Sequence, residues 1–570
     1  MKNISRICVL VVLGFFVSMN FIPAVHVGAV PPPSPSLFEI PGPMTYQASA
    51  HPFGPANEVH VAVNPLDDDH LLVVAKDYSL GDCDFSTPSG SGFHVGSASY
   101  VTKDGGLTWT RSRVPMPYPF VGPIVGLPYA CGSDPVALFG PDGTAYYVVL
   151  NFDYQGPNLG RRAAIAVARS PDGGETWPGS EIRIVEDSPV VDKEWGAVDD
   201  EGRLHIVWSD HTTNTIWYRR SNTAFEFTEP AINMGSGLPG AQVDCGTDDE
   251  VYVFWRSGNN IRFRRSTNEG ADFEPMTTPF IIDRYHAPYD TPRIWCLPSI
   301  VVDDKPDSDY TGRIYLAWQD EDGLAYSNIW MRYSDNEGDT WSAAVLVDEN
   351  DDPALRSIFP SMSLSRNGRV DIAWMQEGPD ANVFNAYAAR SFDGGFTWSQ
   401  YGAVSDRPVI AEFSFHQSGS YFIGDYIGSA STNCRIWVAH PQTHGINPPS
   451  KIIRTDAYLT KVSTCWKIDI AVNKLGILIS EIEDHIRGPI GPWPPCPPVD
   501  CPLNPGQGNS LITKLEVATN KLSQLNVKAA SGVLKAFYNE VKALMKASVI
   551  PPDLGRSWDD SATEIRNLLV

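Results

Sequence analysis

The stretch TKDGGLTW at residues 102–109 recurs along the chain as an eight-residue pattern, Ser/Thr-x-Asp-x-Gly-x-Thr-Trp. Further copies are SPDGGETW (170–177), SFDGGFTW (391–398), SDNEGDTW (334–341) and the worn copies STNEGADF (266–273) and SNTAFEF (221–227). In such a pattern the Asp or Asn side chain accepts hydrogen bonds from backbone amides two residues on, and Gly permits positive φ. The Trp fills the gap between neighbouring sheets. The octamer therefore predicts a rigid turn between strands and not a catalytic motif.

A second repeat surrounds the octamers. It consists of a small or apolar run, a turn and an aromatic-rich strand, as in GAVDDEGRLHIVWSD (196–210) and SMSLSRNGRVDIAW (361–374). Its tryptophans are Trp208, Trp255, Trp318, Trp374 and Trp437, at a spacing that fits four-stranded blades. Seven such hairpins but only six octamers favour an all-β, seven-bladed β-propeller whose last blade lacks an octamer. Six blades is the alternative.

The octamer resembles the Asp box of propellers in the sialidase (neuraminidase) superfamily. That resemblance implies that each box joins the third and fourth strands of a blade, on the face away from the ligand. Every innermost strand would then begin on the opposite face, here called the upper face. The long loops 112–134, 276–298, 344–360 and 400–426 would lie there too. Long loops are often functional, so we expect the site at the centre of the upper face.

The two ends of the chain differ in character from the propeller. Residues 1–29 resemble a signal peptide, with Lys2 and Arg6 before an apolar run and small residues before Val30. We expect the propeller over 30–465, a connecting segment and Pro-rich linker over 466–508, and a helical module over 509–570 with apolar stripes at helical spacing. That module resembles the FIMAH-type domain of some secreted microbial proteins.

Composition narrows the classes of partner. The net charge of -24 argues against nucleic acid or an anionic membrane surface as the main partner, because phosphate binding needs Lys and Arg. We expect a glycan or a surface protein as partner, and no membrane span once the leader is removed. Eight cysteines outside the leader suggest disulfides in an exported protein, with Cys496–Cys501 and Cys83–Cys131 as the expected pairs.

The predicted topology selects polar residues at the starts of the inner strands. Asp134 begins the second, Lys193 and Glu194 the third, and Asp425 and Tyr426 the last. Three arginines, Arg161 or Arg162, Arg293 and Arg356, fall on the same face. Each of these residues alone has an ordinary structural explanation, such as capping backbone amides. Together they form a polar ring that suits a sugar. The expected substrate-binding residues are Arg161, Arg162, Lys193, Arg293, Arg356 and Asp425.

The resemblance implies a specific chemistry. Sialidases of the superfamily hold the substrate carboxylate with three arginines and use a Tyr nucleophile, a Glu that activates it and an Asp acid/base. By predicted position we assign these catalytic roles to Tyr426, Glu194 and Asp134. The sequence departs from the family, however, because no Arg lies between Arg6 and Arg111, where the family has an early arginine. An exo-α-sialidase, a non-catalytic glycan- or protein-binding propeller, and a lyase therefore all stay open.

Metal binding has little support in the sequence. Acidic clusters at 67–69, 303–309 and 348–352 offer oxygen ligands that suit calcium, but none matches a 12-residue calcium loop. They are typical of solvated turns. We expect no metal among the site residues and no required cofactor, with Ca²⁺ the ion that these clusters would suit.

Overall fold

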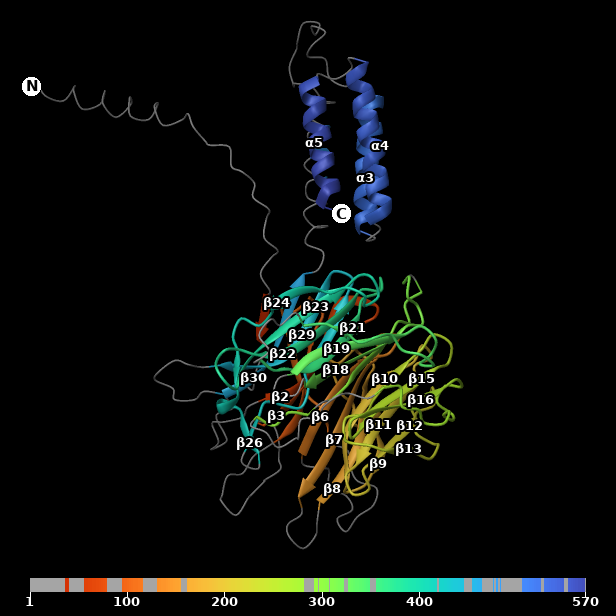
Figure 1. Ribbon diagram of the computed structural model, residues 1–570, viewed down its shortest axis with the longest axis vertical. Helices are drawn as coiled ribbons and strands as arrows, with labels where there is room; N and C mark the ends of the chain where they lie inside the picture. Colours follow the sequence, from red (N-terminus) through yellow and green to blue (C-terminus); the bar gives the residue numbers. More distant parts are fainter. Residues whose placement is uncertain are drawn as a thin grey trace, which may run out of the picture. The chain divides into compact units, whose positions relative to one another are not determined.

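The computed structural model describes most of the β-rich part of the chain, between residues 36 and 463, and three C-terminal helices (Figure 1). The described residues are 36–39, 56–78, 95–115, 131–154, 161–280, 292–295, 297–306, 308–321, 327–348, 355–417, 420–444, 454–463, 475, 478–479, 482, 505–523, 527–547 and 552–568.

In the described part of the chain, seven antiparallel blades follow one another, and all but the last are built from consecutive strands alone. The first three are β2(Ala56–Asn64)–β3(Asp67–Asp77)–β4(Gly96–Thr102)–β5(Thr110–Arg113), β6(Cys131–Phe139)–β7(Ala145–Tyr154)–β8(Arg161–Ser170)–β9(Ile182–Asp187) and β10(Val191–Val198)–β11(Leu204–Asp210)–β12(Thr215–Arg220)–β13(Ile232–Ser236). They form blades 1 to 3.

Blades 4 to 6 repeat this arrangement. They are β14(Gln242–Cys245)–β15(Val251–Ser257)–β16(Asn260–Ser266), β17(Ser299–Val302)–β18(Ile314–Glu321)–β19(Ser327–Ser334)–β20(Val345–Leu346) and β21(Ser357–Leu364)–β22(Val370–Glu377)–β23(Val383–Ser391)–β24(Ser399–Ala403), with β25(Val409–Ile410) also paired to β23. A two-stranded ribbon, β26(Phe415–Gln417) and β27(Ser420–Phe422), follows blade 6. Short 3-10 turns lie at Gly179–Glu181 and Ala411–Phe413.

Blade 7 closes the ring and contains a strand that the sequence analysis did not expect. Its strands are β28(Gly428–Thr432), β29(Arg435–His444) and β30(Arg454–Ser463), with β1(Ser36–Glu39) paired to β30 on the outer edge. Each innermost strand contacts those of the two neighbouring blades, and β28 contacts β2. The fold is therefore a seven-bladed β-propeller, as expected, and its last blade has no octamer.

Apolar clusters fill the gaps between successive blades. One joins Leu72 and Val74 of blade 1 to Tyr147 of blade 2 and includes Trp177, the last residue of an octamer. The recurring tryptophans of the second strands are almost fully buried, Trp208 and Trp374 at 1% exposed. Burial of such side chains between sheets is what holds the separate blades together.

All six octamers follow the third strand of a blade, as the resemblance implied. The predicted side-chain pattern needs one correction. The amide bonded by Asp104 Oδ1 is that of Thr108, four residues on, at 2.9 Å. Thr102 Oγ1 donates to the same carboxylate at 2.7 Å and accepts from the Gly106 amide at 3.0 Å. The turn is thus wider than a simple Asx turn, and it fixes the upper face as the end where the innermost strands begin.

The C-terminal helices are α3(Pro505–Ser523), α4(Val527–Lys546) and α5(Pro552–Leu568). Their buried side chains, among them Leu515, Phe537 and Trp558, form one apolar cluster together with Leu475, Leu478 and Ile482 of the preceding segment. Among the described residues no helix is long and apolar enough to span a membrane. The FIMAH-type resemblance and the domain boundaries stay predictions.

The described cysteines fall into two groups. Cys131 and Cys434 are disulfide-bonded, whereas Cys245 is a buried free thiol. The pairs Cys83–Cys131 and Cys496–Cys501 stay predictions, because Cys83, Cys496 and Cys501 lie outside the described residues.

Candidate functional site

The inner strands of blades 1, 2, 3 and 6 share a bulge near their start. The pairing register shifts between Asn57 and His60 in β2, and at the equivalent places in β6, β10 and β21. A residue with left-handed backbone lies in each bulge: Glu58 (φ 51°), Asp134 (φ 51°), Lys193 (φ 51°) and Phe359 (φ 58°). Such φ values are uncommon outside glycine and need support from the surrounding structure.

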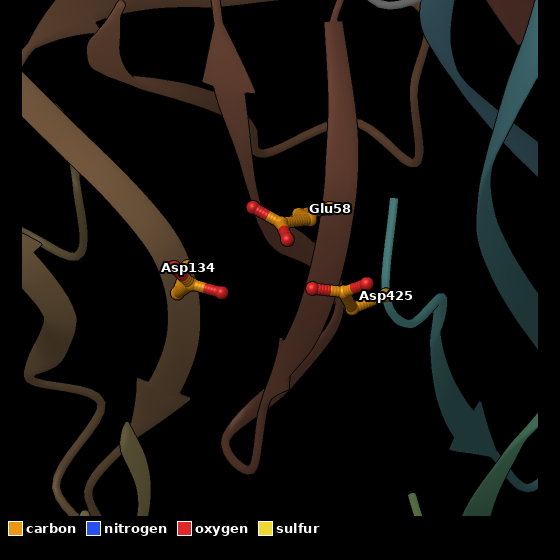
Figure 2. A group of neighbouring side chains, drawn as sticks. All are labelled: Glu58, Asp134 and Asp425. Carbon is orange, nitrogen blue, oxygen red and sulfur yellow. The ribbon is translucent and has the colours of Figure 1, made fainter. Parts of the chain in front are cut away.

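Three of these bulge residues meet Asp425, which precedes β28. Figure 2 shows the carboxyl groups of Glu58, Asp134 and Asp425 turned toward one another from separate segments. Lys193 Nζ contacts all three, at 3.0 Å from Glu58 Oε1, at 2.6 Å from Asp425 Oδ2 and in direct contact with Asp134 Oδ1. We call these four residues the central cluster. It links blades 1, 2, 3 and 7.

Two further cations complete the charge balance around the cluster. Lys76 Nζ lies 3.2 Å from Glu58 Oε2. Arg293 holds Asp425 through two contacts, Nη2 to Oδ2 at 2.5 Å and Nε to Oδ1 at 3.2 Å, and its guanidinium lies 4.1 Å from the centre of the Phe422 ring. A charge-assisted fork of this kind fixes both partners in orientation.

The carboxyl groups of the cluster differ in proton affinity. Burial raises the pKa of Glu58, and the nearby Asp134 raises it further. Burial also acts to raise the pKa of Asp134, but Lys193 and Lys76 outweigh it and hold that pKa below its usual range. The pKa of Lys193 lies well above its ordinary value, because the attraction of Asp134, Asp425 and Glu58 exceeds the effect of burial. Asp134 is thus the ionised carboxylate, and Glu58 is the group that more readily keeps a proton.

Tyr426 and Glu194 lie beside the cluster. The Tyr426 hydroxyl donates to the Pro135 carbonyl at 2.9 Å, and its ring meets Trp195 edge-on with centroids 5.8 Å apart. Burial, followed by the carboxyls of Glu58, Asp134 and Glu194, raises the pKa of Tyr426 well above its ordinary value. No hydrogen bond joins Tyr426 to Glu194 among the described residues. The structure thus brings the three predicted catalytic residues into one region without forming a Tyr–Glu pair.

The predicted binding residues divide into two sets. Lys193, Arg293 and Asp425 belong to the cluster or touch it. Arg356 instead pairs with Glu377 through two contacts of 2.7 Å and with Asn382 Oδ1 at 3.2 Å, and no contact within the described part of the chain connects it to the cluster. Arg161 and Arg162 begin β8, opposite Tyr154 and Asp153, but their side chains lie outside what the structure describes.

Sequence reasoning missed Glu58 and Lys76. Glu58 stands in ANEVHV (56–61), which aligns with GSDPVA (132–137) and VDKEWG (191–196) when the three inner strands are superposed on their bulges. That alignment places Glu58 level with Asp134 and Lys193. A register comparison between blades was therefore the available signal. The segment between Arg6 and Arg111, which contains no arginine, contributes the carboxyl group of Glu58 to the cluster.

The carboxyl groups of Glu58, Asp134 and Asp425 form a candidate cation site. One oxygen each from Glu58, Asp134 and Asp425 lies within 4.8 Å of the others, a donor set that suits a hard cation. The Lys193 ammonium contacts all three carboxyl groups and, together with Lys76 and Arg293, already balances their charge. The residues therefore do not fit a metal ion. Elsewhere, Asp69 pairs with Arg435 and Asp68 with Arg366, so these members of the 67–69 cluster serve in ion pairs.

Comparison with known proteins gives distant likenesses only. No family model matches the chain, and no curated protein matches it. Among solved structures, the α-L-arabinanase of Penicillium chrysogenum is 11% identical with a TM-score of 0.39, over 76% of this chain and 99% of that chain. A polysaccharide lyase named as ulvan lyase is 11% identical with a TM-score of 0.39, over 71% and 95%. The NanB sialidase of Streptococcus pneumoniae is 11% identical with a TM-score of 0.36, over 55% and 64%. At this distance none of them assigns an activity to this chain.

Proposed function

We propose that this propeller acts on glycans at the central cluster, as a glycoside hydrolase that uses the carboxyl groups of Asp134 and Glu58. One observation carries the proposal: two carboxyls with oxygens within 4.8 Å have their pKa values moved in opposite directions. Pairs of carboxyls driven apart in this way serve as ionised group and proton donor in glycosidases.

The chemistry follows from that difference. The Asp134 carboxylate attacks the anomeric carbon while Glu58 gives its proton to the departing glycosidic oxygen. Glu58, now ionised, takes a proton from water, whose oxygen displaces Asp134 and restores the starting state. The short distance between the carboxyls suits this retaining route, because the inverting route leaves room for a water, at about 6.5–9.5 Å. Lys193 keeps Asp134 ionised before attack.

This assignment differs from the sialidase scheme in its nucleophile. Tyr426 donates its hydroxyl proton to the Pro135 carbonyl and lies 7% exposed, and its raised pKa disfavours the phenolate. Asp134 is ionised without any activating base. These observations support a carboxylate nucleophile over Tyr426. Exo-α-sialidase activity is the alternative that the sequence resemblance implies, and the substrate panel below includes a sialoside to test it.

The test is hydrolysis of a panel of fluorogenic neutral glycosides and a sialoside by the full chain. We expect turnover with retention of anomeric configuration, followed by NMR. Asp134→Asn and Glu58→Gln should each lower kcat by about 10²–10⁴-fold, which is the contribution to rate that a positioned acid or base usually makes. Asp142→Asn is the matched control, because Asp142 is exposed at the far end of the same inner hairpin and bonds only its own turn.

Three results would contradict the proposal. Undiminished turnover by Asp134→Asn would remove the proposed nucleophile. Binding of a glycan without turnover of any panel member would favour the non-catalytic propeller, whose partner is a glycan or a surface protein. Loss of activity in Tyr426→Phe alone would return the nucleophile to Tyr426.

We also propose that the protein is exported. The support is the leader-like segment 1–29, which lies outside the described residues. Expression in a secreting host should yield a chain in the medium that begins at Val30, as determined by N-terminal sequencing. An intact Met1 on protein retained by the cells would contradict this.

A further inference from the structure

Glu194 is a buried carboxyl group that the proposed reaction leaves unused. It lies on β10 between Lys193 and Trp195 and is 3% exposed. Within the described part of the chain, neither of its oxygens has a hydrogen-bond partner in another residue. Buried polar atoms without partners are rare in native proteins and call for an explanation, such as a ligand that satisfies them.

The position of Glu194 connects it to the reacting groups. Asp134, Asp192 and Tyr426 lie close enough to interact with it electrostatically. The half-buried Trp195 next to it packs edge-on against both His60 and Tyr426, with ring centroids 5.1 Å and 5.8 Å apart. An apolar ring beside a polar group is a common arrangement around a bound sugar. Glu194 therefore lies where a sugar at the central cluster would meet it.

The cations near the cluster are already engaged. Lys193 contacts three carboxyls, Lys76 pairs with Glu58, and Arg293 forms its fork with Asp425. Within the described residues, no other cation contacts the cluster. Among the side chains that the structure describes, a substrate carboxylate would thus meet carboxyl groups and cations that already have partners, and burying an unpaired charge is costly.

We propose that the site takes neutral glycans and rejects acidic ones, and that the Glu194 carboxyl forms the hydrogen bond to a sugar hydroxyl that orients them. This inference rests on the proposed location of function but not on its chemistry. A protonated carboxyl offers one donor and one acceptor, as a hydroxyl does, so the two match without any charge. Burial first, and then the neighbouring Asp134, raise the pKa of Glu194 well above its ordinary value, which keeps the proton in place.

The experiment measures glycan binding by the full-length unsubstituted chain at low temperature and short contact time, so that turnover is limited and the charges of the central cluster are intact. An array presents neutral oligosaccharides beside matched forms that carry a terminal sialic or uronic acid. We expect the neutral member of each bound pair to be retained at least tenfold more tightly. Preferred retention of acidic members would overturn the inference, and an array that retains nothing would overturn both this inference and the proposed function.

The role of Glu194 itself is tested by two substitutions in the same background. Glu194→Gln keeps a donor and an acceptor and should bind within about threefold of its parent. Glu194→Leu loses both and should bind about tenfold to a hundredfold more weakly, the usual result of leaving a polar group without its partner. Glu201→Leu is the control, because Glu201 is exposed in the turn at the far end of β10. Equal binding by Glu194→Leu and its parent would overturn the assigned role.

Hydrolysis by the unsubstituted chain separates the two proposals. Turnover of an acidic glycoside in preference to its neutral form would overturn the charge selection and leave the hydrolase proposal intact. Binding of neutral glycans without turnover would overturn the hydrolase proposal and leave the selection intact.

Discussion

At the scale of single residues, the inner-strand bulges have a common backbone conformation but carry different side chains. Phe359 has the same left-handed backbone as Glu58, Asp134 and Lys193, yet its side chain is apolar and buried at 2% exposed. The bulge is therefore a property of the propeller. The side chains placed on it in blades 1, 2 and 3 form the central cluster and carry the proposed chemistry.

Asp348 is a buried carboxyl group outside the central cluster, and it allows the effect of burial on protonation to be measured separately. It is 1% exposed, accepts a hydrogen bond from the Ile329 amide at 3.0 Å, and burial raises its pKa to about 7. The folded protein therefore holds this proton more tightly than the unfolded chain. Its contribution to stability is complete at pH below about 4 and is lost as the pH rises through about 7.

Asp348→Asn should remove this dependence, because the amide oxygen keeps the bond to Ile329 and carries no charge. We expect the variant to exceed the parent in free energy of unfolding at pH 8 by on the order of 2–4 kcal/mol, and to equal it near pH 4. Chemical denaturation across this pH range measures the difference. Parallel pH profiles for the two proteins would show that Asp348 is ionised in the fold.

At the scale of elements, the octamer is a stabilising turn whose carboxylate bonds the backbone. Asp172 Oδ1 accepts from Ser170 Oγ at 2.6 Å and from the Thr176 amide at 3.0 Å, and Oδ2 accepts from Thr176 Oγ1 at 2.5 Å. Asn336 takes the same place in another copy and bonds the Thr340 amide at 2.9 Å. An amide oxygen therefore preserves the main bond of the turn.

The loss of stability caused by a substitution within the octamer should depend on which of these hydrogen bonds it removes. Asp172→Ala removes all of them and should lower the free energy of unfolding by about 1–3 kcal/mol. Asp172→Asn keeps the acceptor and should cost less than half as much. Thermal and denaturant unfolding measure both, and glycan binding should be unchanged because the turn lies at the opposite end of the blade from the central cluster. Equal costs for Ala and Asn would contradict the proposed role of the backbone bond.

At the scale of the whole molecule, the central cluster joins parts of the chain that are far apart in sequence. Lys193 in blade 3 contacts Glu58 in blade 1, Asp134 in blade 2 and Asp425 at the start of blade 7. By contacting both Glu58 and Asp425, Lys193 bridges the junction between the first and last blades. The cluster is therefore a closure of the ring as well as the candidate site.

Lys193→Met should weaken that closure by leaving buried carboxyls without their cation. We expect a loss of about 3–5 kcal/mol at pH 7, the usual cost of removing one partner from a buried ion pair. Because Lys193 lowers the pKa of Asp134, the stabilisation it provides exists above the unfolded pKa of Asp and declines as the pH falls through the folded value. The loss should thus be smaller at pH 3 than at pH 7.

The matched control is Lys103→Met, which breaks an exposed pair with Glu175 whose side chains are 45% and 47% exposed. It should cost less than about 1 kcal/mol at either pH. Equal losses for the two variants would indicate that the cluster contributes nothing beyond a surface pair.

The sequence by itself determined the blades, their strand order and the face on which the innermost strands begin. It could do so because the octamers and the recurring tryptophans are local patterns, whose turn and packing preferences act over a few residues. The same reasoning selected Asp134, Lys193 and Asp425 as candidates, since each lies at or just before the start of an inner strand. It also predicted the blade without an octamer.

Only the tertiary structure decided which of these side chains meet and in which protonation state. Closing the ring brings Glu58 against Lys193, 135 residues later in the chain, and pairs β1 with β30. It also assigns Arg356 to Glu377 and not to the cluster. The proton affinities of Glu58, Asp134 and Glu194 follow from burial and from neighbouring charges, and those arise from contacts between blades that no local pattern encodes.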